Sequence, residues 1–100
     1  MQRFDDPAEP IQVGAKERFA ITLAGNPTTG YEWQASVDSN YLVLRMQVFE
    51  PEGKAIGAGG RKVFQFRALR EGETEIAFEY RRSWEGAPLR TRRCRLVIVE

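Results

Sequence analysis

The sequence has no histidine and a single cysteine, Cys94. Nucleophilic catalysis assisted by histidine is therefore excluded, because no imidazole is present to act as the general base. One cysteine also excludes an internal disulfide and argues against a structural metal site built on cysteine ligands. The carboxylates, such as Glu32, Asp38 and Glu85, are scattered and form no recognisable acid–base pair. We expect a protein that is not an enzyme and that has no catalytic residues, metal or cofactor.

A large charge imbalance and long apolar runs are missing as well. The 15 Lys and Arg residues against 14 Asp and Glu residues leave a net charge of +1, too small to attract nucleic acid or an anionic membrane. No apolar run approaches the ~20 residues of a membrane-spanning helix, and the first 15 residues contain no hydrophobic signal-peptide core. We expect a soluble chain without nucleic-acid or membrane partners. Its compartment stays open, secreted or periplasmic if a leader has been removed.

The charges that are present are unevenly placed along the chain. Acidic residues crowd the stretch 71–79, and arginines crowd the stretch 90–95. Pairing across two neighbouring strands would explain this pattern, and a basic docking face is the alternative. An arginine-rich last strand is also typical of a charged sheet edge that discourages association, so we expect a monomer.

Alternation of apolar and polar residues with a period of two dominates the chain after residue 10. Its apolar members include Phe19, Ile21, Leu23, Trp33, Phe64, Phe66, Ile76, Phe78, Cys94, Leu96 and Ile98. Six to eight short strands in 100 residues predict an all-β fold, an immunoglobulin-like antiparallel β-sandwich, with an open barrel as the alternative. We expect Trp33 in the core, a flexible N-terminal lead over residues 1–10, and a single domain over residues 11–100.

Three segments stand out against the regular strands. The first is the uncharged turn Asn26-Pro27-Thr28-Thr29-Gly30-Tyr31, whose proline fixes φ and whose glycine tolerates positive φ. The second is the glycine cluster Gly57-Ala58-Gly59-Gly60, and the third is Arg82-Ser83-Trp84. An uncharged loop can enter a deep cleft without the desolvation penalty of an ion. The first segment is therefore a candidate recognition element.

Strand direction predicts where these segments lie. If consecutive strands run in opposite directions, the connections 24–30, 50–61 and 82–89 emerge at one end of the sandwich. The plain turns at 38–40 and 69–73 then fall at the other end. The three segments are expected to form one composite surface on rigid strands, a common way to build a binding site.

In order and rough spacing, the three segments resemble the signature loops of the chagasin family, which inhibits papain-like cysteine proteases. The first matches fully, and in the third Ser83 stands where the family has proline. The resemblance extends from about Ile11 to Val99. It implies an immunoglobulin-like inhibitor domain whose partner is a papain-like, cathepsin-type protease. It also implies reversible, tight binding in which three loops occlude the active-site cleft.

The segments differ in the contribution expected from each. Thr28 and Thr29 are expected at the centre of the cleft, and the glycine cluster is expected to pair with the substrate-binding strand of the protease, as the resemblance implies. An exposed Trp84 near Arg82 is typical of an interface hot spot, with Arg82 meeting a carboxylate of the partner. Tyr31 is expected to brace its loop rather than contact the protease.

Each segment also has an ordinary structural interpretation. The first can be a plain hairpin turn, the second a flexible connection, and Trp84 can fold back over the end of the sandwich. The fold by itself fits a noncatalytic adhesion or ligand-binding module equally well, because fold does not fix function. Such a module would bind through a sheet face and would tolerate changes at Thr29 or Trp84.

Overall fold

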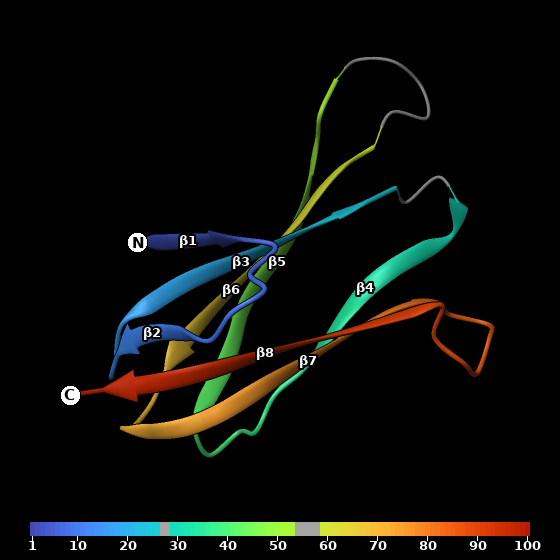
Figure 1. Ribbon diagram of the computed structural model, residues 1–100. Helices are drawn as coiled ribbons and strands as arrows, with labels where there is room; N and C mark the ends of the chain where they lie inside the picture. The colour runs from blue at the N-terminus through green and yellow to red at the C-terminus, as the bar shows by residue number, and fades with distance from the viewer. Residues whose placement is uncertain (27–28, 54–58) are drawn as a thin grey trace.

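Two sheets pack face to face in the computed structural model, which describes residues 1–26, 29–53 and 59–100 (Figure 1). The described residues form eight strands: β1 (Gln2–Asp5), β2 (Ile11–Gly14), β3 (Arg18–Gly25), β4 (Tyr31–Ser36), β5 (Leu42–Pro51), β6 (Gly60–Ala68), β7 (Gly72–Arg82) and β8 (Arg90–Val99). One sheet has the order β1-β3-β6-β5 and the other the order β2-β8-β7-β4. This confirms the predicted all-β sandwich.

Two edge pairings differ from the predicted antiparallel arrangement. Strand β1 pairs with β3 in parallel, and β2 pairs with β8 in parallel. The reason is that the chain changes sheet twice near its start, so that β1 and β2 lie in different sheets. Each therefore runs beside a strand that follows later in the chain. Alternation with a period of two reports which face is buried but not which strand lies alongside.

The N-terminal segment predicted as a flexible lead contains strand β1. Its register places Asp5 beside Thr22 of β3, and the ring of Phe4 packs edge-on against Phe19 with centroids 6.4 Å apart. The segment is short and rich in Asp and Pro, which lowers its strand propensity. Tertiary pairing with β3 overrides that local preference.

The core lies between the inward faces of β3, β6, β7 and β8. Four phenylalanines are almost fully buried there: Phe19, Phe64, Phe66 and Phe78. Their rings contact one another across the two sheets, with Phe64 and Phe78 centroids 5.3 Å apart. Trp33 is 4% exposed and belongs to this core, as predicted. Aromatic pairs of this kind add to the free energy gained from area burial.

Cys94 faces inward in β8, as the sequence predicted, and is 4% exposed. Burial in apolar surroundings raises the pKa of its thiol to about 11. The thiol therefore stays protonated at neutral pH. Buried cysteines of this kind are chemically inert.

Strand β8 is not the charged sheet edge that its arginines predicted. It lies between β2 and β7, and the edges of its sheet are β2 and β4. Arg93 and Arg95 alternate with the buried Cys94 and lie on the outer face, where Arg93 forms an ion pair of 2.7 Å with Glu75 of β7. The expected pairing across neighbouring strands is confirmed for Arg93 and Glu75. Arg90 lies instead over the rings of Trp33 and Tyr80. The edge of the sheet next to β8 is formed by the short apolar strand β2.

Candidate functional site

Three loops emerge at the same end of the sandwich: loop 1 (residues 26–30), loop 2 (residues 52–59) and loop 3 (residues 83–89). Figure 1 shows the strand ends that lead into them toward the right, whereas the β4–β5 and β6–β7 connections lie at the opposite end. The pairing of Gly25 with Gly60 joins the roots of loops 1 and 2. The pairing of Tyr31 with Arg82 joins loops 1 and 3. The described roots of the three segments therefore lie at one end of the sandwich.

Four of the predicted site residues lie outside the described residues: Pro27, Thr28, Gly57 and Ala58. The structure describes the other nine. These are Asn26, Thr29, Gly30, Tyr31, Gly59, Gly60, Arg82, Ser83 and Trp84.

Loop 1 is a turn closed by its own polar groups. The backbone N–H and the hydroxyl of Thr29 both donate to the carbonyl oxygen of Asn26, at 3.3 and 2.8 Å. The N–H of Asn26 donates to the hydroxyl of Tyr80 at 3.3 Å, which ties the turn to β7. Gly30 has a φ of +84°, a conformation that favours glycine. The turn presents an exposed Thr29 whose hydroxyl is already used internally.

Loop 3 presents Trp84, which is 70% exposed. The indole lies against loop 1, because a Cβ atom built on Gly30 would come within 2.9 Å of its Cη2 atom. Trp84 thus does not fold into the core, and its indole contacts Gly30 at the end of the sandwich. A large aromatic side chain held in place and left open to solvent is typical of a binding anchor.

Arg82 links loop 3 to loop 1. Its guanidinium lies 4.4 Å from the ring centroid of Tyr31 and 5.7 Å from that of Trp84. Its Nε donates to the carbonyl oxygen of Thr29 at 3.3 Å, and its Nη1 lies 3.3 Å from Glu85 Oε1. Within the protein, the carboxylate beside Arg82 is that of Glu85 in loop 3. Arg82 acts here as a clamp between two loops.

Tyr31 connects this clamp to the core, as expected of a brace. Its ring stacks on Tyr80 with centroids 5.3 Å apart, and Tyr80 contacts Trp33 at 4.9 Å. The indole N–H of Trp33 donates to the carbonyl oxygen of Ala24 at 2.8 Å. A continuous series of rings therefore runs from the buried core to the tip. Stacked rings with few rotatable bonds hold a surface loop at low entropic cost.

Loop 2 has a root in which glycine is required by the hairpin itself. A Cβ atom on Gly60 would lie 2.3 Å from the carbonyl oxygen of Glu50 and 2.6 Å from the ring of Phe49. Gly60 is buried, so its small size accommodates Phe49. Gly59 is half-buried, and its carbonyl oxygen accepts the N–H of Glu52 at 3.0 Å. This bond closes the root of the loop.

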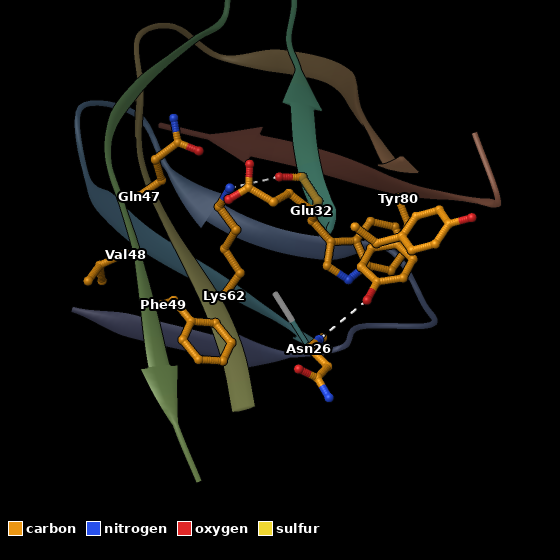
Figure 2. A pocket seen from close by; sticks show the side chains of 10 residues that line it. Asn26, Glu32, Gln47, Val48, Phe49, Lys62 and Tyr80 are labelled. Atoms are coloured by element: carbon orange, nitrogen blue, oxygen red, sulfur yellow. Dashed lines mark hydrogen bonds between the residues drawn. The ribbon is translucent and has the colours of Figure 1, made fainter. Parts of the chain in front are cut away.

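A recess of about 370 Å³ lies between the roots of loops 1 and 2. Figure 2 shows Phe49 and Lys62 on one side and Tyr80 on the other, with Asn26 near its edge. Trp33 also lines the recess. The side chain of Lys62 extends from β6 of one sheet to β4 of the other, where its ammonium group donates to the carbonyl oxygen of Trp33 at 2.9 Å. This bond satisfies an edge carbonyl of β4 and blunts that sheet edge.

Around this tip, the described residues offer no group of three or more His, Cys, Asp or Glu side chains placed to hold a metal ion. Within residues 1–26, 29–53 and 59–100 there is also no helix with the length and hydropathy of a membrane span. The chemistry that the tip offers is an uncharged turn, an exposed indole, main-chain polar groups and the ion pair of Arg82 with Glu85.

The sequence model of the chagasin family of peptidase inhibitors (I42) matches residues 12–98. The chain belongs to the chagasin family. This confirms the resemblance seen in the three loop segments. Members of the family are peptidase inhibitors and not enzymes, in agreement with the expected absence of catalytic function.

Two known proteins are similar to this chagasin-family chain over most of its length. Chagasin of Trypanosoma cruzi is 29% identical over 82 residues, which cover 76% of this chain and 74% of chagasin. Amoebiasin-1 of Entamoeba histolytica is 31% identical over 81 residues, which cover 80% of this chain and 79% of that protein.

Two solved structures share the chagasin-family fold. The crystal structure of the cysteine protease inhibitor EhICP2 from Entamoeba histolytica has a TM-score of 0.81 at 24% identity, covering 97% of this chain and 94% of that chain. PbICP-C, solved in complex with falcipain-2, has a TM-score of 0.61 at 13% identity, covering 99% and 98% of the two chains. These likenesses support the β-sandwich architecture.

Two residues that position this chagasin-family tip were missed by the sequence reasoning. Arg81 donates from Nη2 to the carbonyl oxygens of Glu85 and Gly86, at 3.1 and 2.9 Å, and so holds loop 3 from behind. Lys62 crosses between the sheets, as described above. The available signal for Arg81 was its position just before the turn that contains Glu85 and Gly86. No local pattern indicates the contact between Lys62 and β4, which lies 29 residues away.

Proposed function

We propose that this protein is a reversible, tight-binding inhibitor of papain-like cysteine proteases that occludes the active-site cleft with loops 1, 2 and 3. The observation that carries the proposal is the direct contact between loops 1 and 3, made by Trp84 against Gly30 and by Arg82 with Thr29. Membership of the chagasin family supports it. So does the likeness in fold to an inhibitor that was solved in complex with falcipain-2.

The chemistry of loop 1 suits a cleft that already contains a charged catalytic pair. The described residues of loop 1 are uncharged, so their burial carries no desolvation penalty of an ion. They also leave the cysteine–histidine ion pair of a papain-like protease undisturbed. Thr28 and Thr29 are the residues that we assign to the centre of the cleft.

Trp84 is the main anchor in this proposal. Burial of an exposed tryptophan at the centre of an interface is worth roughly 2–4 kcal/mol. The clamp made by Arg82, Tyr31 and Glu85 holds loop 3 before binding, which reduces the entropy lost on association. Loop 2 is assigned to main-chain pairing with the protease, by way of Gly57, Ala58 and Gly59. An interface of this type buries roughly 800 Å² on each partner, sufficient for nanomolar affinity.

An enzyme assay tests this function. Papain or a cathepsin-type protease, calibrated by active-site titration, is mixed with increasing concentrations of the protein and assayed with a fluorogenic peptide. We expect complete inhibition that competes with substrate, with an inhibition constant on the order of nanomolar. Dilution of the complex should restore protease activity, and the recovered inhibitor should be uncleaved.

Two outcomes would contradict the proposal. Absence of inhibition at micromolar concentration would favour the adhesion or ligand-binding module. Progressive cleavage of the protein, with full activity at the end, would identify it as a substrate. The fold alone is compatible with both, so the assay decides between functions and not between folds.

A further inference from the structure

The root of loop 2 is held from outside by a network of charged side chains on the outer face of the β1-β3-β6-β5 sheet. The network consists of Arg3, Asp5, Glu50, Glu52 and Arg61. Arg61 of β6 is its centre, because its guanidinium forms an ion pair with Asp5 of β1 and a second one of 3.0 Å with Glu52. Arg3 reaches across the sheet to Glu50 at 2.7 Å. Three chain segments are thus joined at one point.

Asp5 reaches this position because β1 is fixed along β3. The side chain of Thr22 is fully buried, and its hydroxyl donates to the carboxylate of Asp5. The N–H of Asp6 donates to the carbonyl oxygen of Thr22 at 2.8 Å. A buried hydroxyl requires a hydrogen-bond partner. The carboxylate of Asp5 accepts this hydrogen bond from Thr22 and also forms the ion pair with Arg61. This arrangement gives the carboxylate a defined orientation.

One of the two residues paired with Arg61, Glu52, closes loop 2. Glu52 follows directly after β5, and its N–H bonds to Gly59. Arg61 follows Gly60, whose inner side is covered by the ring of Phe49. The hairpin root is therefore held by an aromatic ring on the inner side and by ion pairs on the outer side. Figure 1 shows that the β5–β6 hairpin projects beyond the other strands at this end.

We propose that β1 is a brace for loop 2, in which Asp5 and Arg61 are positioning residues that set the direction of the loop relative to loop 1. Its effect on inhibition rests on the proposed function. The side chains of Asp5, Glu52 and Arg61 are 57%, 58% and 35% exposed. Ion pairs of that exposure contribute little to folding stability and are screened by salt. The brace therefore acts on the orientation and local opening of the hairpin root.

Amide hydrogen exchange at Glu52 tests the brace in the free protein. Asp5→Asn keeps the hydrogen bond with Thr22 and removes the charge, and Arg61→Gln removes the other partner. Arg93→Gln is the matched control, because it deletes a similarly exposed ion pair on the other sheet. We expect the first two variants to exchange at Glu52 about two- to fivefold faster than the wild type at low salt, with unchanged melting temperature. High salt should remove most of this difference.

Dissociation from a papain-like protease, measured by surface plasmon resonance, supplies the second readout. Asp5→Asn and Arg61→Gln should each dissociate about two- to fivefold faster than Arg93→Gln at low salt. Equal exchange at Glu52 in all three variants would overturn the brace. If Arg61→Gln fails to fold, the comparison of Asp5→Asn with Arg93→Gln decides. If the wild-type protein binds no protease, the proposed function fails while the exchange measurement still decides on the brace.

Discussion

The indole of Trp84 in loop 3 packs against Gly30 in loop 1, so closely that a Cβ atom on Gly30 would come within 2.9 Å of Cη2. These residues are 54 positions apart in the sequence, yet together they form the edge that we assign to protease binding. The contact requires both the small size of Gly30 and its φ of +84°. It makes the shape of loop 1 dependent on loop 3.

Replacing Gly30 tests this dependence. Gly30→Ala forces a side chain into a left-handed conformation, which costs about 1–2 kcal/mol, and also displaces Trp84. We expect lower stability in urea unfolding by about that amount and weaker inhibition. Gly86→Ala in loop 3 is the matched control, because a Cβ atom there would meet nothing within 4 Å. Equal inhibition by the two variants would show that the contact is unimportant.

Arg82 should act inside the inhibitor rather than on the protease. Arg82→Lys keeps the charge but loses the planar group that lies over Tyr31, so we expect binding to weaken by about 1 kcal/mol. The indole N–H resonance of Trp84 should also shift in the free protein, whereas that of Trp33 should not. Glu85→Gln combined with Arg82→Lys should cost less than the sum of the single changes. Loss of affinity with no shift at Trp84 would instead indicate a direct contact with the protease.

Ser83 offers a route to tighter binding. Among the described non-glycine residues, only Asp6 and Lys16 have positive φ. Ser83 therefore has a negative φ, the sign that proline requires. Ser83→Pro should reduce the freedom of loop 3 and lower the inhibition constant by a factor equivalent to about 0.4–1 kcal/mol. A larger inhibition constant for this variant would mean that the geometry of loop 3 does not suit proline.

Because the thiol of Cys94 is buried, we expect the free energy of unfolding to fall at alkaline pH. Burial raises the pKa of its thiol from 9.0 to about 11, so between these values the folded state holds a proton that the unfolded state releases. Its contribution to stability is complete below pH 9 and decreases as pH rises toward 11. Urea unfolding at pH 8 and 10.5 should show a steeper loss for the wild type than for Cys94→Ala. Equal losses would mean that the thiol does not titrate in this way.

The sequence predicts the sandwich well because its strands have one buried face. Alternation of apolar and polar residues correctly predicted that Phe19, Phe64, Phe78 and Cys94 face inward. The alternating direction of the strands then predicted that the three loops lie at one end. Neither argument depends on side chains that are distant in sequence. This is why the fold and the positions of the described loop roots could be predicted.

The errors have a common physical origin in lateral and long-range contacts. The period of a strand does not reveal its neighbours, so β1 was missed and β8 was placed at an edge. Arg61 meets Asp5 across 56 positions, and Arg82 meets Thr29 across 53. Such pairs are made by the folded chain alone. Arginines assigned from the sequence to a partner can therefore be engaged within the protein.

The dissociation rate of the Trp84→Ala variant from a papain-like protease tests most directly whether the end carrying loops 1, 2 and 3 binds the enzyme. Leu69→Ala is the control, because Leu69 is an exposed apolar residue, 39% accessible, in the β6–β7 connection at the opposite end. We predict that Trp84→Ala accelerates dissociation by a factor equivalent to about 2–4 kcal/mol, while Leu69→Ala matches the wild type. An unchanged rate for Trp84→Ala, or an equal effect of Leu69→Ala, would contradict the account.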